Sequence, residues 1–232
     1  TLLHLDHIPA IDEDQKNVDF LPLLKRALEA GYQSVMIDGS RLPLAQNIAV
    51  TRQAAELAAK YGSAVEAELG AVAGHEGVGI GLSYEELFTS KKGFTKTEEA
   101  AQFARESGCD WLSVAAGSFH GAIAAATKHL KKPEARLDIA HIAELSAATG
   151  HMPLVLHGGS GIKQEYILRA MENGIAKINV ATEIRQPYEF ALEEKPGNIT
   201  YAQQKVYDRT RWVLHDFLHT TNNHDTLKGD SK

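Results

Sequence analysis

Histidines and carboxylates stand at the ends of successive short apolar runs in this sequence. Asp6 and His7 close the run LLHLD. His120 follows the run WLSVAAGSF, and His157 closes the run PLVL. The strands of a β/α barrel all direct their C-terminal ends at one face, so residues at those ends converge however far apart they lie in sequence. Three imidazoles with one or more carboxylates form a divalent metal site of catalytic type, which keeps an open position for substrate.

Further carboxylates and one more histidine belong to the same pattern. Glu66 and Glu68 share one strand face, and two carboxylates that point into a barrel interior are unfavourable unless they are paired or metal-bound. Asp38 ends the run QSVMID, where it would support a ligand or cap a turn. Glu76 lies in a long loop, where a mobile acid or base would sit, although alone it is more typical of a solvated charge. His4 shares a strand face with the aspartate two residues later.

Two turns connect late strands to helices and contain glycines and hydroxyl groups. The first is HGGSG over residues 157–161, and the second is NVAT over residues 179–182. Adjacent strand-to-helix turns late in a barrel present backbone amides and hydroxyls at helix N-termini, which is the usual phosphate cradle of this fold. A GGSG stretch alone is equally typical of a tight turn, and its position beside a candidate metal ligand is what favours a phosphate site.

The elements that must position these residues alternate along the chain. Runs rich in Val, Ile and Leu alternate with segments of helical periodicity, which predicts an α/β fold with a parallel sheet. We expect strands over residues 2–6, 33–38, 64–69, 110–115, 153–157 and 176–180. We expect helices over residues 19–30, 44–61, 97–107, 138–149, 163–173 and 182–194. Six β/α units fit either an open doubly wound sheet or a (β/α)8 TIM barrel without its first two strands. The start at Thr1, inside an expected strand, favours the barrel.

This barrel is expected to form a single, N-terminally incomplete catalytic domain over residues 1–219, followed by a polar, disordered tail over residues 220–232. Residues 8–18 form a polar loop, and residues 71–95 form a long Gly-rich loop suited to a lid. Residues 200–219 form a C-terminal helix that would pack on its own barrel or at a subunit interface. Its apolar residues are Trp212, Leu214, Phe217 and Leu218.

Composition limits the classes of protein that fit. The chain has 232 residues, of which 44% are hydrophobic, enough for one sizeable core. The net charge of −6 argues against a general affinity for nucleic acid or an anionic membrane, although a local basic pocket would still hold a phosphate. No stretch reaches the roughly 20 apolar residues of a membrane helix. The single cysteine, Cys109, makes no intrachain disulfide, which favours a buried thiol and a cytoplasmic location.

Six blocks occur in the same order as in a known family. The blocks are HLDH, SVMIDGS, VEAELG with a glutamate eight residues beyond its second glutamate, AAGSFHG, PLVLHGGSGI and KINVATE. This order resembles the class II, metal-dependent fructose-bisphosphate and tagatose-bisphosphate aldolases. The resemblance runs from about residue 2 to residue 185, which is most of the chain.

The resemblance implies a metal centre. His7, His120 and His157 match the zinc ligands, and Glu68 matches a glutamate that approaches or leaves the metal. The metal would be Zn²⁺ or another divalent ion, with a monovalent cation (K⁺ or Na⁺) nearby in many members of the family. The carboxylates expected to support the ligands are Asp38 and Glu66.

The resemblance also implies acid–base and substrate-binding roles. Asp6 matches the residue that handles the proton of the C4 hydroxyl, and Glu76 matches the loop acid that exchanges the proton at the nucleophilic carbon. The residues expected to hold the ketose phosphate are Gly121, Gly158, Ser160, Asn179, Ala181 and Thr182.

The sequence also departs from the family pattern, which predicts a divergent subgroup. The loop after His7 begins with Ile8 and Pro9 rather than the common glycine, and it is longer. Arg41 replaces a histidine that often follows DGS. The match fades after residue 182, so the arginine that some members supply from a late helix has two candidates, Arg209 and Arg211.

The activity implied is aldol cleavage of fructose 1,6-bisphosphate to dihydroxyacetone phosphate and glyceraldehyde 3-phosphate, by a cytoplasmic homodimer or homotetramer. The nearest alternative substrate, tagatose 1,6-bisphosphate, differs only in configuration at C4. A metal-dependent barrel hydrolase would need a metal-binding aspartate on the last strand, where this chain has Asn179. A non-catalytic barrel partner should have lost ligands that this chain retains. Cleavage through a Schiff base needs an interior lysine, and Lys177 is expected at the wrong end of its strand.

Overall fold

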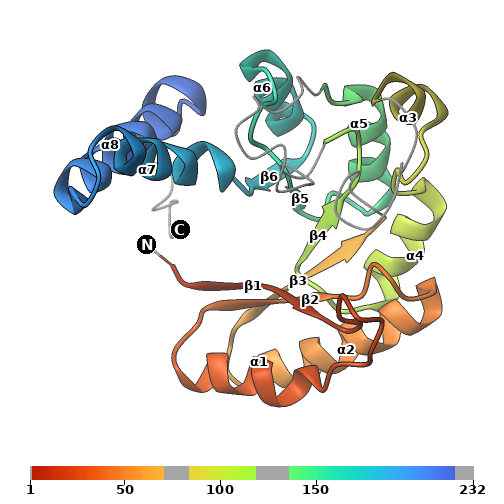
Figure 1. Ribbon diagram of the computed structural model, residues 1–232. Coiled ribbons are helices and arrows are strands. Elements are labelled where there is room, and N and C mark those ends of the chain that lie inside the picture. Colours follow the sequence, from red (N-terminus) through yellow and green to blue (C-terminus); the bar gives the residue numbers. More distant parts are fainter. Residues whose placement is uncertain (1, 71–83, 119–135, 223–232) are drawn as a thin grey trace.

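The computed structural model describes residues 2–70, 84–118 and 136–222, and over these residues strands and helices alternate (Figure 1). The strands are β1 (His4–Pro9), β2 (Ser34–Asp38), β3 (Ala64–Leu69), β4 (Trp111–Val114), β5 (Leu154–Leu156) and β6 (Ile175–Ile178). The helices are α1 (Phe20–Glu29), α2 (Leu44–Ala59), α3 (Tyr84–Ser90), α4 (Thr97–Glu106), α5 (Ile139–Ala148), α6 (Gln164–Glu172), α7 (Thr182–Glu194) and α8 (Ile199–Trp212), which continues as a π-helical turn (Val213–Phe217).

The six strands form one parallel sheet in the order β1-β2-β3-β4-β5-β6. Each strand therefore pairs with its neighbour in sequence. This is the order of consecutive strands in a β/α barrel, whereas a doubly wound sheet reverses direction at a switch point. The expected (β/α) barrel architecture, with six units in this chain, is confirmed, and the doubly wound alternative is wrong.

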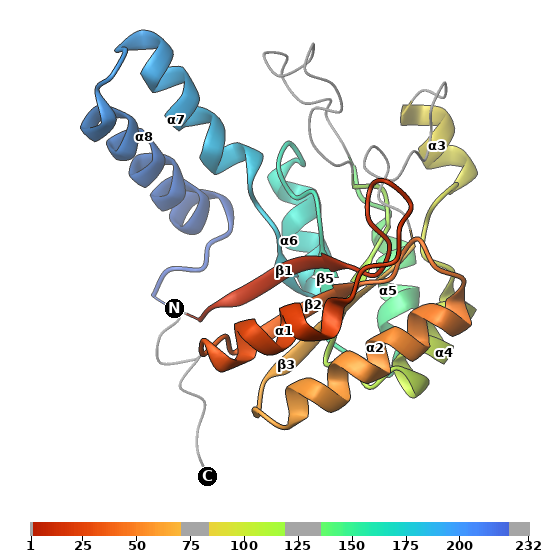
Figure 2. The same cartoon turned by 60° about the horizontal axis from the view of Figure 1, so that its bottom comes forward.

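The two faces of the sheet differ in polarity because side chains alternate along each strand. On β3, Val65, Ala67 and Leu69 belong to the apolar cluster that also contains helix residues. The glutamates between them, Glu66 and Glu68, are buried on the opposite, inner face. In Figures 1 and 2 the helices α1, α2, α4 and α5 lie around the outside of the curved sheet. The outer face therefore supplies the core, and the inner face supplies polar groups.

The helix boundaries follow the expected ones within about two residues, except that α3 lies within the stretch 71–95, which was expected to be a single loop. A glycine at positive φ follows within three residues of the end of each helix from α1 to α7. The helix α7 lies beside α8, and this pair projects beyond β6 in both views (Figures 1 and 2). The single cysteine, Cys109, is buried as expected, and burial raises the pKa of its thiol to about 11.

The first strand differs from its prediction in a way that matters for the site. It runs over His4–Pro9 rather than residues 2–6, so Asp6 and His7 lie within the strand and not at its end. The pairing with β2 shifts between Leu5 and Ile8, and His7 has a positive φ of 46°. Such a bulge re-aims side chains, and a non-glycine residue held at positive φ is typical of a functional site.

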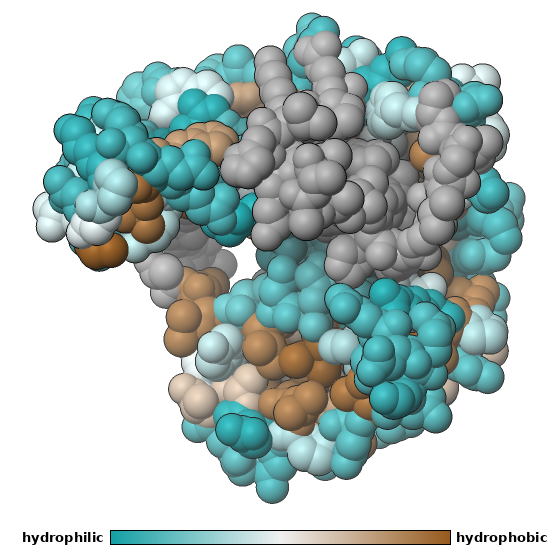
Figure 3. Space-filling model, viewed as in Figure 1, coloured by the Kyte–Doolittle hydropathy of each residue, from teal (hydrophilic) through white to brown (hydrophobic). Residues whose placement is uncertain are grey.

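The surface around β1 is partly apolar. Figure 3 shows brown surface over β1 and α1 in the lower part of the molecule. Leu2 and Leu3, just before β1, are 76% and 52% exposed, and Leu23 of α1 is also exposed. By contrast, Phe217 and Leu218 of the C-terminal segment pack against the protein's own core cluster.

None of the helices in the described part of the chain is long and apolar enough to cross a bilayer.

Candidate active site

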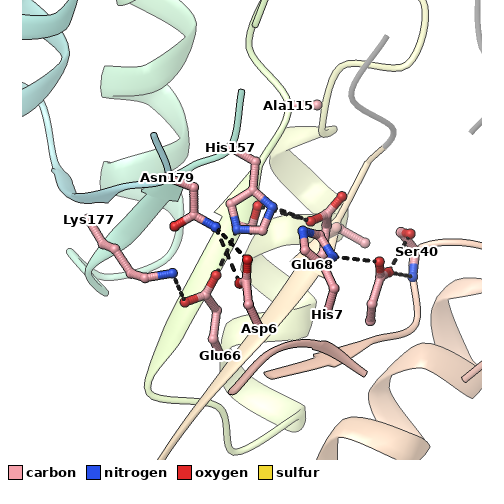
Figure 4. A network of polar contacts seen from close by, with 12 residues as sticks. Asp6, His7, Ser40, Glu66, Glu68, Ala115, His157, Lys177 and Asn179 are labelled. Atoms are coloured by element: carbon pink, nitrogen blue, oxygen red, sulfur yellow. Dashed lines mark hydrogen bonds and ion pairs between the residues drawn. The ribbon is translucent and has the colours of Figure 1, made fainter. Parts of the chain in front are cut away.

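Residues from both ends of the sheet meet on its inner face (Figure 4). His7 comes from the bulge in β1, and His157 directly follows β5. Their ring centroids are 4.6 Å apart, with the planes at 65°. Potential ligand atoms of Asp6, His7 and His157 all lie within 4.8 Å of one another. The structure thus brings together two of the three histidines that the sequence selected.

Three of the predicted site residues, Glu76, His120 and Gly121, lie outside the described residues.

The His157 ring is held between the two glutamates of β3. Its Nε2 lies 2.9 Å from Oε1 of Glu66, and its Nδ1 lies 2.9 Å from Oε2 of Glu68. The side chains of His157 and Glu66 are completely buried. Ser113 donates a hydrogen bond to Glu68 from the neighbouring strand β4. Each ring nitrogen of His157 therefore faces a buried carboxylate, Nε2 that of Glu66 and Nδ1 that of Glu68.

His7 has a carboxylate partner of its own. Its Nδ1 lies 3.1 Å from Oδ2 of Asp38, at the end of β2. Ser40 donates to the other oxygen of Asp38 through both its backbone amide and its hydroxyl. Burial alone would raise the pKa of Asp38, but these hydrogen bonds lower it to about 2. Asp38 therefore stays ionised, and its contact with Nδ1 restrains the orientation of the His7 ring.

Hydrogen bonds between His157 and the glutamates outweigh burial in setting the pKa values of His157 and Glu66. Burial alone would lower the pKa of His157, but hydrogen bonds to Glu66 and Glu68 raise it to about 10. Burial raises the pKa of Glu66, and its bonds to His157 and Lys177 lower it more. In the metal-free protein the His157 ring is therefore an imidazolium between two carboxylates.

Asp6 has a different environment, because 46% of its side chain is exposed. Asn179, just after β6, donates to both of its oxygens at 3.3 and 3.2 Å, and His4 lies 3.5 Å away. Burial raises its pKa, but His4 and the positive charges of His7, His157 and Lys177 lower it well below its usual range. Asp6 is thus an accessible, ionised carboxylate next to the two imidazoles.

Lys177 corrects the sequence analysis. It was set aside as lying at the wrong end of the sixth strand, yet its Nζ lies 2.8 Å from Oε2 of Glu66 on the inner face of the sheet. Alternation along β6 directs Lys177 inward, and the sequence signal was its position two residues before Asn179. Its ammonium is engaged with a buried carboxylate, which does not suit a Schiff-base nucleophile.

The predicted phosphate cradle borders a cavity of about 560 Å³. Ser160 and Thr182 line it, whereas the Asn179 side chain is directed at Asp6. Ser160 Oγ accepts a hydrogen bond from the backbone amide of Glu183, in the first turn of α7. Gly158, before the cavity, has a φ of 71°, and Ala181 immediately precedes α7.

The other wall of this cavity comes from residues that the sequence analysis did not assign to the site. Trp212, Val213 and Phe217, from the end of α8 and the turn that follows it, line the cavity. Arg209, one of the two late arginines, lies over the Trp212 ring at 3.9 Å and forms an ion pair with Glu183. Arg211 is exposed. The C-terminal helix thus contributes to the candidate phosphate site.

A second cavity, of about 290 Å³, is formed by the loops after β1 and β2. His7 and Asp38 lie on its wall, so it adjoins the candidate metal site. Arg41 lines it as well and donates to the backbone oxygen of Asp12 at 2.7 Å. The substituted residue Arg41 therefore lies beside the site rather than far from it.

The donor set fits a transition metal such as Zn²⁺. Imidazole nitrogens with one carboxylate are common ligands of catalytic zinc. One nitrogen of each ring contacts a supporting carboxylate, Asp38 for His7 and Glu66 for His157. Two further groups have potential ligand atoms within 4.8 Å of one another: His7 with Asp38 and Glu68, and His4 with Asp6 and Glu66. Two of the three groups contain His7 and the third contains its neighbour Asp6, so the candidate metal site lies at the bulge of β1.

Comparison with known proteins points in one direction. The family model for class II fructose-bisphosphate aldolase matches residues 1–223. The 6-phospho-5-dehydro-2-deoxy-D-gluconate aldolase of Bacillus velezensis is 38% identical over 183 residues, which cover 78% of this chain and 53% of that protein. The chain therefore spans about half the length of this curated relative.

Solved structures agree on the fold. The YdjI aldolase from Escherichia coli K12 is 28% identical, with a TM-score of 0.70 over 93% of this chain and 69% of its own. The fructose-bisphosphate aldolase from Campylobacter jejuni has a TM-score of 0.66 over the same shares of the two chains. Its identity of 18% makes it evidence of the fold alone.

Metal binding should displace a proton from His157. Its pKa of about 10 means that the ring is protonated near neutral pH, and a metal ligand must be deprotonated. We predict that Zn²⁺ added to metal-free protein at about pH 8 releases protons, and that the release from His157 declines as the pH approaches 10. Titration calorimetry in buffers of different ionisation enthalpy measures this. The His157→Gln variant should lose this contribution and the exposed His215→Gln variant should keep it; zinc binding without proton release would contradict the assignment.

Proposed function

The chain belongs to the class II fructose-bisphosphate aldolase family, and from this membership we propose that it catalyses metal-dependent aldol cleavage of fructose 1,6-bisphosphate. The products would be dihydroxyacetone phosphate and glyceraldehyde 3-phosphate. The single observation that carries the proposal is the convergence of His7, His157 and the ionised Asp6 within 4.8 Å on the inner face of the sheet. An aldol cleavage needs both an electrophile and a base at such a point.

His7 and His157 would hold the metal, with His120 as the third imidazole that the sequence motif supplies. A divalent ion bound there supplies a Lewis acid that stabilises the negative charge developing on the substrate's carbonyl oxygen. Asp38 and Glu66 orient the two rings through 3.1 and 2.9 Å contacts to their other nitrogens. The chain's own contribution is thus a fixed and oriented pair of ligands.

Asp6 would remove the proton of the C4 hydroxyl. Its lowered pKa keeps it ionised, and 46% exposure leaves its oxygens open to a substrate. Asn179 holds the carboxylate with two hydrogen bonds, so its orientation is set before the substrate arrives. Proton removal from that hydroxyl drives cleavage of the C3–C4 bond, and Glu76 would return a proton to carbon.

The cavity lined by Ser160 and Thr182 would hold the phosphate of the dihydroxyacetone half. Backbone amides and hydroxyls at the beginning of α7 suit a phosphate because the helix N-terminus carries partial positive charge. Binding energy at this remote group would hold the reacting carbons at the metal.

A second substrate is favoured by the relative from Bacillus velezensis, whose name specifies 6-phospho-5-dehydro-2-deoxy-D-gluconate. That sugar acid contains the same ketone beside a phosphorylated carbon, but it ends in a carboxylate rather than a second phosphate. The cavity beside His7 would receive this end of either substrate, with Arg41 as the cationic partner beside the carboxylates of Asp12, Glu13 and Asp38 that also line it.

Activity assays distinguish these substrates. We predict that the protein releases dihydroxyacetone phosphate from fructose 1,6-bisphosphate, that a chelator abolishes the activity, and that added Zn²⁺ restores it. Tagatose 1,6-bisphosphate and the deoxygluconate phosphate are assayed in parallel. Preferential turnover of either one would replace the substrate but keep the reaction. Activity that survives exhaustive chelation, or no cleavage of any of the three sugars, would overturn the proposal.

The Asp6→Ala variant tests whether Asp6 acts as a general base rather than as a metal ligand. We predict that the variant still binds zinc while its turnover number falls by about 10²–10⁴-fold, the usual contribution of a single general base. Asp14→Ala, a change at a 76% exposed carboxylate in the loop after β1, is the matched control and should keep full activity. Zinc content by atomic absorption is measured beside the rate. Unchanged turnover would remove Asp6 from the mechanism, and loss of zinc would make Asp6 a ligand.

A further inference from the structure

We propose that Lys177 is a positioning residue for the metal site and acts through Glu66 on the ring of His157. The proposal rests on the proposed function, because it assumes that His157 ligates the metal. It concerns a lysine whose contact with the site was visible only in the structure.

The contacts form a chain of three side chains (Figure 4). Nζ of Lys177 donates to Oε2 of Glu66 at 2.8 Å, and Oε1 of Glu66 lies 2.9 Å from Nε2 of His157. Each oxygen of the carboxylate therefore has its own strong partner. The side chains of Glu66 and His157 are fully buried, and Lys177 is 27% exposed. This series of contacts thus runs from the partly exposed Lys177 through the buried Glu66 to His157, the candidate metal ligand.

The two contacts together fix the plane of the Glu66 carboxylate. A glutamate carboxylate with a hydrogen bond at one oxygen can rotate about its Cγ–Cδ bond. A carboxylate with hydrogen bonds at both oxygens cannot rotate without losing one of them. The fixed oxygen holds Nε2 of His157, which leaves Nδ1 directed toward Glu68 and the cluster with His7. Partners of this kind, on the far nitrogen of a metal-binding imidazole, orient the ring and tune its affinity for metal.

Lys177 also gives Glu66 a permanent positive partner. A carboxylate that is completely buried is destabilising unless a cation balances it. The next nitrogen near Oε2 among the described residues is Nε2 of His4, which lies 3.5 Å away, farther than Nζ of Lys177. Loss of Lys177 would therefore leave Oε2 of Glu66 without a close donor among the described residues, and the carboxylate would be free to turn toward His4.

The alternative is that Lys177 only stabilises the fold. A merely structural lysine would change the unfolding temperature without changing the affinity of the folded protein for metal. A positioning lysine would change both the affinity and the geometry at the metal. The experiment therefore measures metal binding to folded protein rather than activity alone.

Metal-free wild-type protein and three variants are titrated with Co²⁺, whose visible absorption reports the ligand geometry. We expect Lys177→Met to weaken metal binding about tenfold, the lower end of the range for residues that support a ligand, and to change the Co²⁺ spectrum. Lys177→Arg keeps the charge and should restore most of the affinity. Lys60→Met, at an exposed lysine after α2, is the matched control and should bind as the wild type does.

A double-mutant cycle tests whether Lys177 acts through Glu66. If it does, Lys177→Met should weaken binding little or not at all once Glu66 is replaced in Glu66→Gln, because the intermediary is already lost. Equal effects of Lys177→Met in the two backgrounds would overturn the proposal. If Lys177→Met does not fold on its own, Lys177→Gln, which removes the charge but keeps a polar side chain, replaces it in both backgrounds of the cycle.

The outcomes separate this proposal from the proposed function. Wild-type protein that binds neither Co²⁺ nor Zn²⁺ would overturn the proposed function itself. Wild-type protein that binds metal, together with a Lys177→Met variant of equal affinity and unchanged spectrum, would overturn only the role of Lys177.

Discussion

Two glutamates buried on the inner face of β3 impose the arrangement of the site. Glu66 and Glu68 are 0% and 2% exposed, and a carboxylate in that position requires a positive or hydrogen-bonding partner. The partners come from the neighbouring strands and from the far end of the sheet: Ser113, His157 and Lys177. The curvature of the six-stranded sheet brings these partners close to Glu66 and Glu68, so the curved arrangement of the strands and the pairing of the charges depend on each other.

This constraint predicts that the stability of the fold and the binding of a metal would depend on the same residues. The apolar face of β3 packs against the helices, while its polar face holds the imidazole that would ligate a metal. Breaking a buried pair by removing one partner usually costs about 3–5 kcal/mol, because the remaining charge has no compensation. A metal ion held by His7 and His157 would add positive charge next to Glu68, so metal binding would also help to balance the charges of the buried glutamates.

The sequence predicted the alternation of elements, and it selected Asp6, His7 and His157, which lie close together on the inner face, because a barrel brings residues of separate strands to one site. It failed at three points, each with a physical cause. The boundaries of β1 were shifted because a bulge at His7 is not visible in an apolar pattern. Lys177 was misjudged because β6 runs over Ile175–Ile178 rather than residues 176–180, so the lysine lies near the end of the strand and not at its start. The helix α3 was missed because the composition around it is typical of a loop.

X-ray diffraction from zinc-loaded crystals, collected on both sides of the zinc absorption edge, tests whether His7 and His157 bind the same ion. We expect one strong anomalous peak between the two rings, about 2.0–2.1 Å from a nitrogen of each, with His120 completing the set of imidazoles. A peak that contacts neither ring, or a zinc-loaded crystal in which the two rings bind separate ions, would contradict this expectation.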